Sequence, residues 1–600
     1  MDQLSGPVRY TGGEIANLDY HHGQLRPAVG VQHYQVLRAN RSHPEWADGF
    51  GWTYNHAPML AYWNETFYLE YLSDPVSEHV PPGQTLLVTS RDGIHWGKPL
   101  VVFPQYRLAE DVRRPDGVVL QAGTAAVMHQ RMGFYVSPGG KLLALGFYGF
   151  CPTPKDKPND GLGIGRVVRE IGIDGAFGPI YFIRYNGHAG WDEENTQFPF
   201  YRESPDAAFL DACEALLTDK LATLQWWEED RSSDGFYAVE EQRALSYYRL
   251  PDGRIVGLWK SSNAAISSDE GRTWSLVEDV PSLIMAGAKI WGQQTSDGNY
   301  ALVYNPSPTG THRWPLAIVT GENGTDFDRM LLAGGEVPPR RYGGQHKDYG
   351  LNYVRGIEAA NGMPPRGSLW ITYSMNKEDI WVCEIPVPVQ DRIHSHVRDE
   401  FTDLVSGGPV PGWNIYSPLW APVTVEDFPS MADKSLRLAD RDPYDYAKAE
   451  RVFPESRRVE IRCKISAGQS DHGQLFIECC DGKSTAPLRV VFDSNGYIRV
   501  LNQGYYVEVH PYEAGVWYDV AISVDAVLQN YELAIGGIKK KFRFFAPVLS
   551  VERITFRTGP VRRDPHLETR VQGGDVGDGD EPVPEAIYYI NLMETNGEEL

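Results

Sequence analysis

The chain has 600 residues, more than the roughly 250–300 at which a single hydrophobic core stops growing, so at least two domains are expected. Hydrophobic residues make up 42% and charged residues 22% of the sequence, as in ordinary globular proteins. The net charge of −23 argues against nucleic acid as a partner, because phosphate binding needs a basic surface. An acidic ligand would need its own local group of Arg, Lys or His side chains.

The N-terminus reads MDQLSGPVRYTGGE and lacks both the basic and the apolar segments of a signal peptide. No run of about 18 apolar residues is present, so we expect no membrane partner. We therefore expect a cytoplasmic protein, or a secreted or periplasmic one if a signal peptide has been removed. The six cysteines are sparse and lack Cys-x-x-Cys spacing, so neither a disulfide framework nor a zinc site is predicted. The oligomeric state is left open.

Short strand-like runs separated by turn residues fill the first 390 residues. They form five sets, at 57–103, 123–185, 236–268, 287–333 and 351–386. Each of the first four sets has four runs, and the fifth has three. The early run 31–38 would supply its missing strand and close a ring. Because four-stranded units repeated radially make a propeller, we predict an N-terminal β-propeller of six blades, with five or seven as the alternatives.

One segment, 186–235, interrupts this rhythm. Within it, residues 205–227 show helical periodicity, with Pro205 and Asp206 at the expected start. We predict an inserted helix beside the propeller.

A second β-rich unit follows a connector, which gives the division 1–390, 391–412 and 413–600. The DSNG turn at 493–496 between two alternating runs predicts a hairpin. The pattern resembles the concanavalin-like jelly roll, a β-sandwich, so the whole chain is expected to be all-β. The aromatic run from Trp413 to Tyr446 is expected to pack against the propeller.

The C-terminal unit contains an acidic glycine-rich loop, 573–581, with Asp575, Asp578 and Asp580. The spacing of these carboxylates does not match an EF-hand. We predict a solvated loop, with a structural calcium site as the alternative, and no other cofactor.

Residues 267–274, SSDEGRTW, match the Asp-box pattern SxDxGxTW. A shorter copy begins at Ser90, at the matching place in the first set, and a decayed one that begins at Thr320 ends the fourth set. This recurrence resembles the sialidase superfamily of β-propellers. In an Asp-box the Asp side chain caps turn amides, the Gly permits positive φ and the Trp wedges between strands. We therefore expect a structural rather than a catalytic role for Asp269.

The sequence departs from true sialidases in its catalytic signature. Arg26-Pro27 is the nearest fragment of their FRIP segment, and neither their arginine triad nor their nucleophilic Tyr maps residue by residue. The chain is also similar to propeller enzymes that act on rhamnose–glucuronic acid linkages, some of them α-L-rhamnosidases and some polysaccharide lyases. In both, the resemblance implies chemistry by His, Tyr and Arg side chains.

Candidate site residues lie at or just before the innermost strand of each set, because these strands meet at the axis of a propeller. The catalytic candidates are His56, His129, Tyr342 and Glu358. The substrate-binding candidates are Trp52, Asn55, Gln130, Lys289, Gln293, Asn305, Arg313, His346 and Arg355. No metal ligands are assigned.

Three functions are consistent with these residues, each with an oligosaccharide as the partner. The first is an exo-acting glycoside hydrolase on oligosaccharides that contain rhamnose or uronic acid. The second is a polysaccharide lyase, in which His and Tyr act as base and acid while Arg or Lys stabilises the enolate-like charge. The third is a non-catalytic glycan-binding protein, since fold alone does not fix function. Hydrolysis by two carboxylic acids needs a pair about 5–9.5 Å apart, and spacing singles out no such pair.

Overall fold

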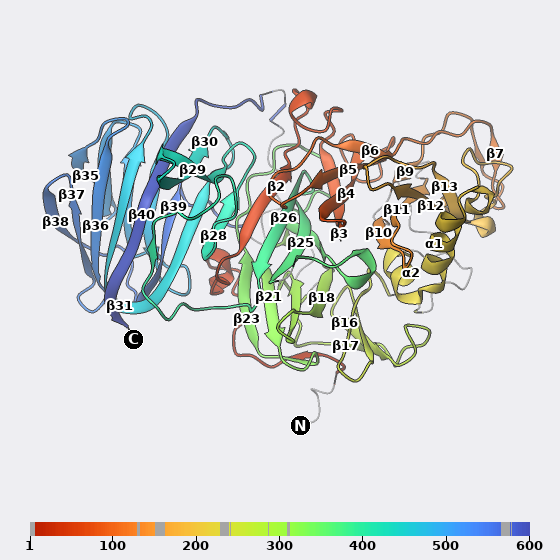
Figure 1. The fold of residues 1–600 in the computed structure, drawn as a ribbon, viewed down its shortest axis with the longest axis horizontal. Helices are drawn as coiled ribbons and strands as arrows, with labels where there is room; N and C mark the ends of the chain where they lie inside the picture. The colour runs from red at the N-terminus through yellow and green to blue at the C-terminus, as the bar shows by residue number, and fades with distance from the viewer. Residues whose placement is uncertain are drawn as a thin grey trace.

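The computed structural model describes residues 6–128, 132–150, 162–227, 239, 242–285, 287–308, 312–365, 367–565, 576–577 and 579–599. Two bodies built almost wholly from strands lie side by side (Figure 1). The first holds the strands up to β26, and the second holds β28 to β40. The all-β prediction is confirmed. Among the described helices, none combines the length and apolarity that crossing a bilayer requires.

Four sheets of the first body follow one another along the chain. The first is formed by β3 (Tyr54–Trp63), β4 (Thr66–Asp74), β5 (Gln84–Ser90) and β6 (Leu100–Phe103). The second is formed by β10 (Gly133–Val136), β11 (Leu142–Gly149), β12 (Gly165–Ile171) and β13 (Tyr181–Tyr185), with β9 (Val127–Met128) beside β11. The third is formed by β14 (Ser246–Arg249), β15 (Ile255–Trp259), β16 (Asn263–Ser267) and β17 (Glu278–Asp279). The fourth is formed by β18 (Ile290–Gln294), β19 (Tyr300–Tyr304), β21 (Leu316–Gly321) and β23 (Arg329–Gly334).

A fifth sheet closes the ring. It contains β24 (Tyr349–Gly356), β25 (Ser368–Met375) and β26 (Asp379–Pro386), and the early strand β2 (Gln32–Leu37) pairs antiparallel with β26. The predicted role of run 31–38 is thus confirmed. The described residues form five such sheets, which lies within the predicted range and is one fewer than the six first expected.

Contacts between sheets identify the innermost strands. β24 contacts both β3 and β18, β14 contacts β18, and β10 contacts β3. These strands therefore surround the axis of the propeller. Residues at their ends and in the adjoining loops are placed to meet there.

The inserted segment forms two helices, α1 (Ala207–Thr218) and α2 (Lys220–Trp227). Asp206 caps α1, and its side chain accepts hydrogen bonds from the amides of Ala208 and Phe209, so the predicted start is confirmed. The single predicted helix is divided at Asp219, whose carboxylate accepts the amide of Ala222 at 3.0 Å. Asp219 thus ends one helix and caps the next.

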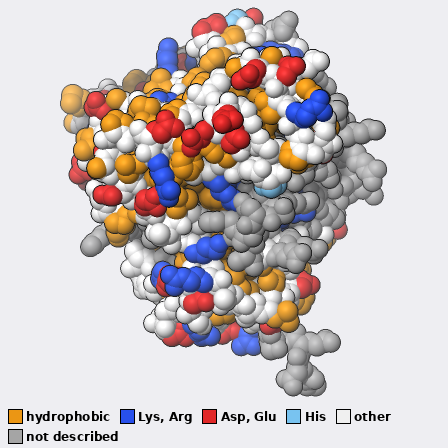
Figure 2. Space-filling view, turned by 90° about the vertical axis from the view of Figure 1, so that its right-hand side faces the viewer, with side chains coloured by type: hydrophobic (Ala, Val, Ile, Leu, Met, Phe, Trp, Pro, Cys, Tyr) orange, Lys and Arg blue, Asp and Glu red, His pale blue; other side chains and the backbone are white. Residues whose placement is uncertain are grey.

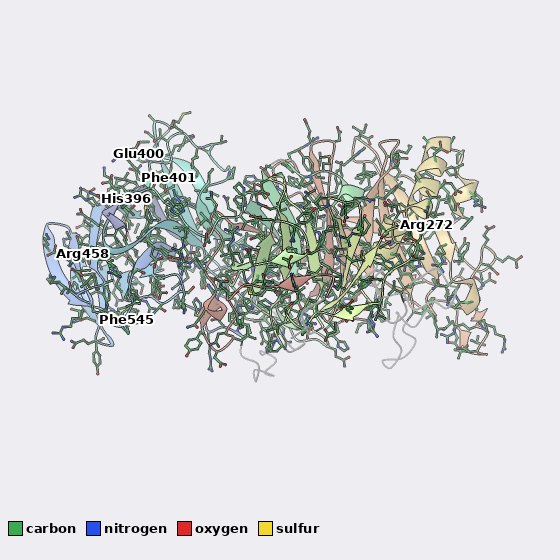
Figure 3. The ribbon with its side chains drawn as sticks, turned by 90° about the horizontal axis from the view of Figure 1, so that it is seen from below. Arg272, His396, Glu400, Phe401, Arg458 and Phe545 are labelled. Carbon is green, nitrogen blue, oxygen red and sulfur yellow. The ribbon has the colours of Figure 1, made fainter. Side chains whose placement is uncertain are left out.

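The Asp-box has the predicted structural geometry. The Asp269 carboxylate accepts the Thr273 amide at 2.8 Å and the Thr273 hydroxyl at 2.6 Å, and the Ser267 hydroxyl accepts the Gly271 amide at 2.9 Å. Gly271 has φ +74°, which favours glycine. Arg272, in the same turn, lies at the part of the propeller remote from the second body (Figure 3). The Ser90 copy makes the same turn contacts through Asp92.

The second body is organised around β31 (Lys448–Ala467), which pairs with β28, β36, β39 and β40. The strands that precede β31 are β28 (Trp413–Ser417), β29 (Val423–Ser430) and β30 (Asp433–Asp440). The strands that follow it are β32 (Leu475–Cys480), β33 (Leu488–Asp493), β34 (Tyr497–Asn502), β35 (Tyr505–Pro511), β36 (Trp517–Asp525), β37 (Asn530–Ile535), β38 (Ile538–Arg543), β39 (Val551–Arg557) and β40 (Ala586–Glu599). The predicted hairpin at 493–496 joins β33 to β34.

Shorter strands complete the two bodies. They are β1 (Arg9–Tyr10) with β22 (Asp326–Phe327), β7 (Val112–Arg113) with β8 (Val119–Leu120), β20 (His312–Arg313) with β24, and β27 (Arg398–Asp399) with β40. Around β27, the imidazole of His396 lies 3.0 Å from the Gly597 carbonyl, and Phe401 packs against Trp413; Figure 3 labels His396 and Phe401 at the edge of the second body.

The two bodies are joined by a strand pair and by aromatic packing. β2 runs parallel to β28, with Gln32 opposite Ile415. The ring of Tyr416 stacks on Trp381 of the propeller with centroids 4.7 Å apart, which confirms the expected packing of the aromatic run.

A buried ionic network also links the bodies through the acidic loop. Asp580 accepts hydrogen bonds from Arg38 at 2.7 and 2.8 Å and from Arg341 at 2.7 Å. Asp580 is fully buried, so the prediction of a solvated loop is wrong at this residue: two guanidinium groups compensate its charge. Asp575 and Asp578 lie outside the described residues.

Candidate active site

Two innermost strands carry a β-bulge where the axis passes. The pairing of β3 with β4 shifts register between His56 and Met59, and Ala57 has φ +48°. The pairing of β24 with β25 shifts between Asn352 and Arg355, and Tyr353 has φ +56°. Bulges re-aim side chains, and a positive φ in a non-glycine residue marks a strained backbone of the kind found at functional sites. The two bulges bring the rings of His56 and Tyr353 to 4.5 Å.

Three lysines surround the Tyr353 ring. The Lys260 ammonium donates to the Tyr353 hydroxyl at 2.8 Å. The ammonium groups of Lys260 and Lys289 lie 4.5 Å from the ring centroid, and that of Lys377 lies 5.7 Å away. Positive charges fixed around a phenol stabilise negative charge that develops on its oxygen. Lys289 and Lys377 are buried and Lys260 is half-buried, in a protein whose net charge is −23.

Two acidic residues balance part of this charge. The Lys377 ammonium lies 3.1 Å from Asp348 and 3.8 Å from Glu78. Burial alone would raise the pKa of Glu78, but Lys377 and the neighbouring His79 hold it well below its usual value. Burial alone would lower the pKa of Lys377, but Glu78 and Asp348 raise it. Glu78 and Lys377 are therefore both charged at neutral pH.

The pKa of Asp74, four residues before Glu78, is shifted in the opposite direction. Burial, reinforced by the charge of Glu78, raises the pKa of Asp74 well above its usual value, which favours the protonated form of this carboxyl. Two nearby carboxyl groups whose pKa values are pushed apart can divide the roles of acid and base. Asp74 is thus a buried proton donor beside a carboxylate.

His56 is a buried, neutral imidazole. Burial, reinforced by Lys377, Lys289 and Lys260, holds the pKa of His56 well below its usual value. Its Nδ1 lies 2.7 Å from the Ser374 hydroxyl, and its Nε2 has no hydrogen-bond partner among the described residues. A buried imidazole nitrogen in this state can accept a proton.

We call Tyr54, His56, Asp74, Glu78, Lys260, Lys289, Asp348, Tyr353 and Lys377 the axial cluster. Tyr54 lies within it: its ring centroid is 5.7 Å from that of His56, and burial and Glu78 raise its pKa well above the usual value. Of the residues proposed from sequence, His56 and Lys289 belong to the cluster. Arg313 lies close enough for its charge to lower the pKa of Lys377.

Several other proposed residues have contacts outside the cluster. The Asn55 amide donates to the Glu378 carbonyl at 2.8 Å, and the Asn305 amide donates to the Pro315 carbonyl at 3.1 Å. Trp52 lies 5.5 Å from the Phe50 ring, His346 is exposed 6.1 Å from the His79 ring, and Gln293 is half-buried on β18. Asn55 and Asn305 therefore support the backbone near the axis.

Tyr342 and Glu358 also lie elsewhere. Tyr342 donates to Asp580 at 2.9 Å, in the network between the bodies. Glu358 accepts from Gln225 of α2 at 2.9 Å, and burial raises its pKa to about 7 against the opposing effect of Arg355. Their placement separates both residues from the axial cluster.

His129 and Gln130 lie outside the described residues.

The outer surface differs from the cluster in its charge pattern. On the propeller end drawn in Figure 2, basic side chains are interspersed with acidic ones. The three lysines around Tyr353 are instead grouped at the axis, where Lys289 and Lys377 are buried.

Comparisons with known proteins give two family matches. Residues 6–243 match the family model described as BT_1020-like, N-terminal beta propeller, and residues 413–572 match the one described as sialidase-like, CBM domain. A solved structure titled "Sialidase" is 44% identical, with a TM-score of 0.94, over 99% of this chain and 54% of that one. This chain therefore spans about half the length of that protein.

More distant structures include a protein of unknown function from Dyadobacter fermentans, with 14% identity and a TM-score of 0.36 over 59% of this chain and 99% of that one. Trypanosoma rangeli sialidase has 11% identity and a TM-score of 0.34 over 95% of this chain and 97% of that one. No curated protein matches this chain.

Proposed function

We propose that this chain, which joins a sialidase-superfamily β-propeller to a sialidase-like carbohydrate-binding module, is a glycoside hydrolase that releases an acidic sugar from an oligosaccharide. The observation that carries this proposal is the Tyr353 phenol held at 2.8 Å by Lys260 and flanked by Lys289 and Lys377. The 44% identical structure titled "Sialidase" supports the hydrolase class. The active site belongs to the body that we assign to residues 1–390.

The acidic sugar is inferred from charge. A carboxylate entering a buried group of cations gains electrostatic stabilisation that water cannot offer. Lys289 and Arg313 are the cations we assign to it, because Lys289 lies 4.5 Å from the Tyr353 ring and the charge of Arg313 acts on Lys377. Of the two sugars considered from sequence, uronic acid fits these cations, and rhamnose would be its neighbour in the oligosaccharide.

The bond cleavage can be divided among the residues of the cluster. Tyr353 attacks the anomeric carbon while His56 accepts the phenol proton through Nε2, and Asp74 gives its proton to the departing glycosidic oxygen. The C–O bond to the leaving group breaks as the bond to Tyr353 forms. Water then attacks the anomeric carbon, and Asp74 takes its proton. As the bond between the sugar and Tyr353 breaks, His56 returns its proton to the phenolate oxygen, and the sugar leaves with its original stereochemistry. Tyr in place of a carboxylate nucleophile has precedent in glycosidases.

The same residues favour one alternative, β-elimination. A neutral His56 beside Tyr353 can remove the proton next to a uronate carboxyl group, while lysines stabilise the resulting charge. Mass spectrometry after reaction in H₂¹⁸O separates the two. A released sugar carrying ¹⁸O establishes hydrolysis, and products that sum to the substrate mass establish elimination.

The variant pair Tyr353→Phe and Tyr248→Phe tests the assignment. Tyr248 is equally buried in the propeller, but its hydroxyl donates to the Gly324 carbonyl at 2.7 Å. We expect Tyr353→Phe to reduce turnover at least about 10³-fold and Tyr248→Phe to leave it within about threefold. Equal activity in the two variants would remove Tyr353 from the mechanism. If the unmodified protein binds acidic oligosaccharides without product, the chain is a glycan-binding protein.

A further inference from the structure

A tight turn near the N-terminus places two adjacent imidazoles at the boundary between the bodies. The short 3-10 segment His21–Gln24 has positive φ at His22, Gly23 and Gln24, at 51°, 65° and 55°. Three successive residues in this region are held only where the surroundings determine the conformation. The rings of His21 and His22 stack with centroids 3.8 Å apart and therefore face the same neighbours.

The second body supplies a carboxylate to these imidazoles. Asp564 follows β39, and its Oδ2 lies 2.7 Å from Nδ1 of His21 and accepts the His22 amide at 3.3 Å. One ligand atom from each of His21, His22 and Asp564 lies within 4.8 Å of the others. Two imidazole nitrogens and a carboxylate oxygen are ligands that Zn²⁺ prefers.

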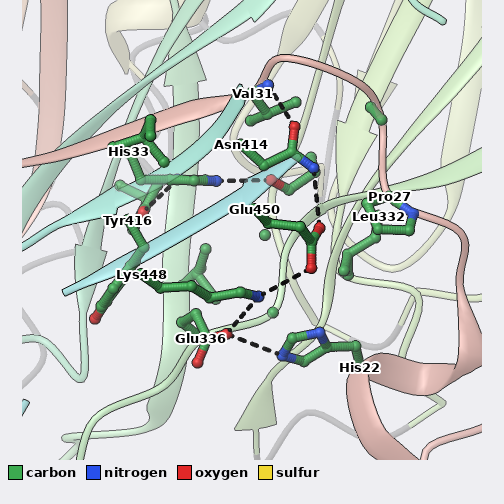
Figure 4. Close-up of a pocket in the computed structure, with 17 residues that line it drawn as sticks. His22, Pro27, Val31, His33, Leu332, Glu336, Asn414, Tyr416, Lys448 and Glu450 are labelled. Carbon is green, nitrogen blue, oxygen red and sulfur yellow. Dashed lines mark hydrogen bonds and ion pairs between the residues drawn. The ribbon is translucent and has the colours of Figure 1, made fainter. Parts of the chain in front are cut away.

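The far side of His22 has the partner that a metal-bound imidazole requires. Nε2 of His22 lies 3.5 Å from Oε1 of Glu336 (Figure 4). Glu336 is itself held by Lys448 at 3.0 Å and by the Tyr446 hydroxyl. A carboxylate on the second ring nitrogen fixes the tautomer and orientation of a ligating histidine. Since Nε2 faces Glu336, we assign Nδ1 of His22 as the ligand atom for a cation.

We propose that His21, His22 and Asp564 bind a divalent transition-metal ion, with Zn²⁺ as the best match, and that the ion ties the N-terminal segment to the C-terminal body. Bond lengths of about 2.0–2.2 Å set ligand atoms roughly 3.2–3.6 Å apart in a tetrahedron. The His21–Asp564 hydrogen bond therefore opens by less than about 1 Å on binding. The remaining position is taken by water, because His21 and Asp564 are partly exposed and give the ion a path from solvent.

Lys448 and Arg562 both lie close to Glu336, with their charged groups 3.0 Å and 3.7 Å from its carboxylate. The charge of Lys448 also acts on His22, and the negative charge of Glu336, 3.5 Å from His22, offsets it. Both residues come from the second body, so Glu336 of the propeller already joins the two bodies. The metal site would extend this junction to the segment that precedes β2.

The test uses the full chain, stripped of metal with a chelator and dialysed against a small excess of ZnCl₂. Metal analysis should give one Zn²⁺ per chain, and the melting temperature should rise by several degrees when zinc is added. Co²⁺ should give visible absorption bands typical of a site with mixed nitrogen and oxygen ligands. Asp564→Asn and His22→Ala should each reduce zinc affinity at least about 10-fold.

A matched control is available in the second body. His472 and Asp471 form an exposed pair at the same 2.7 Å distance but belong to no three-ligand group among the described residues. His472→Ala should leave zinc stoichiometry and the zinc-dependent rise in melting temperature unchanged. His21→Gln, at a partly exposed position, provides a second ligand variant if His22→Ala fails to fold. Zinc binding that survives both Asp564→Asn and His21→Gln, or that is lost in His472→Ala, would overturn the proposal.

This inference does not depend on the proposed glycosidase activity, because its readouts are metal content, absorption and melting temperature.

Discussion

Glu358→Gln gives a sharp test of the electrostatics of the propeller, because it replaces a buried carboxyl group by a neutral one of nearly the same shape. Burial raises the pKa of Glu358 to about 7 in the folded protein, and its ordinary value is 4.5. Between these values the folded state binds more protons than the unfolded state, so the free energy of unfolding falls as the pH rises. The free-energy cost of ionising the buried Glu358 is fully present above pH 7 and absent below about pH 4.

The size of the effect follows from the pKa difference. Each pKa unit corresponds to about 1.4 kcal/mol, so the ionised form of Glu358 costs about 3 kcal/mol at pH 8 and about 1 kcal/mol at pH 5. Glu358→Gln removes this cost and retains an amide oxygen that can accept from Gln225. We therefore expect the variant to exceed the unmodified protein in stability by about 3 kcal/mol at pH 8.

Thermal unfolding at pH 5 and pH 8 measures this difference. At about 2 °C per kcal/mol for a large domain, the melting temperature should rise by about 6 °C at pH 8 and by about 2 °C at pH 5. Glu78→Gln is the control of opposite sign. The pKa of Glu78 is held well below its usual value, so its loss should destabilise the protein at pH 8 and matter less as the pH falls. A pH-independent effect of Glu358→Gln would refute the reasoning, and loss of turnover would return Glu358 to the active site.

Three further variants address the site and its scaffold. His56→Gln should reduce turnover about 10²- to 10⁴-fold while the protein stays folded, and full activity would exclude proton transfer by His56. Asp269→Ala should lower the melting temperature and leave kcat/KM within about twofold, because its carboxylate caps the Asp-box turn; a stable but inactive variant would contradict this. Asp580→Asn should accelerate amide hydrogen exchange at residues 341 and 342, whereas Glu478→Gln, which breaks a buried pair with Arg557 in the second body, should not.

Most of the fold could be predicted from the sequence because it depends on local patterns. The alternation of apolar and polar residues and the spacing of turn residues located the strands of five sheets, and the early run 31–38 was correctly expected to close the ring. The Asp-box identified the blade type because each of its side chains bonds within its own turn. The break at Asp219 was missed, since helical periodicity continues across it.

The axial cluster was only partly predictable, because two β-bulges determine which side chains of the innermost strands point toward the axis. In a regular strand successive side chains alternate between faces, and nothing in the sequence of β24 marks the point at which this alternation is broken. The bulge at Tyr353 breaks it and turns this ring toward His56. Lys260 and Lys377 were missed for a related reason. They follow β15 and β25 instead of preceding innermost strands, and their side chains reach the axis from the third and fifth sheets.

The basic and aromatic segment 340–355 contains residues with two different roles. From the sequence alone, its concentration of Arg, His and Tyr predicts a loop over a binding site. Tyr353 does belong to the axial cluster, but Arg341 and Tyr342 bond to Asp580 of the C-terminal body. This one segment thus contains both the candidate nucleophile Tyr353 and the residues that contact the C-terminal body.

The turn between β25 and β26 connects these two parts physically. Lys377 points to Asp348 in the axial cluster, at 3.1 Å. The next residue, Glu378, accepts the backbone amides of Arg341 and Tyr342 at 3.0 and 2.8 Å. Two adjacent residues of this short turn thus have different roles. Lys377 belongs to the proposed active site, whereas Glu378 holds the backbone of the loop that Asp580 of the C-terminal body also contacts.

This connection implies that the C-terminal body is more than a separate binding module. Asp580 holds Arg341, and the backbone of Arg341 is held by Glu378, so displacement of the acidic loop would release the turn that carries Lys377. Side chains must be held within about 1 Å for efficient catalysis. A propeller separated from residues 413–600 should therefore lose activity through misplacement of Lys377, even where every residue of the axial cluster is retained. An isolated propeller with undiminished turnover would show that the buried network stabilises the junction without positioning the site.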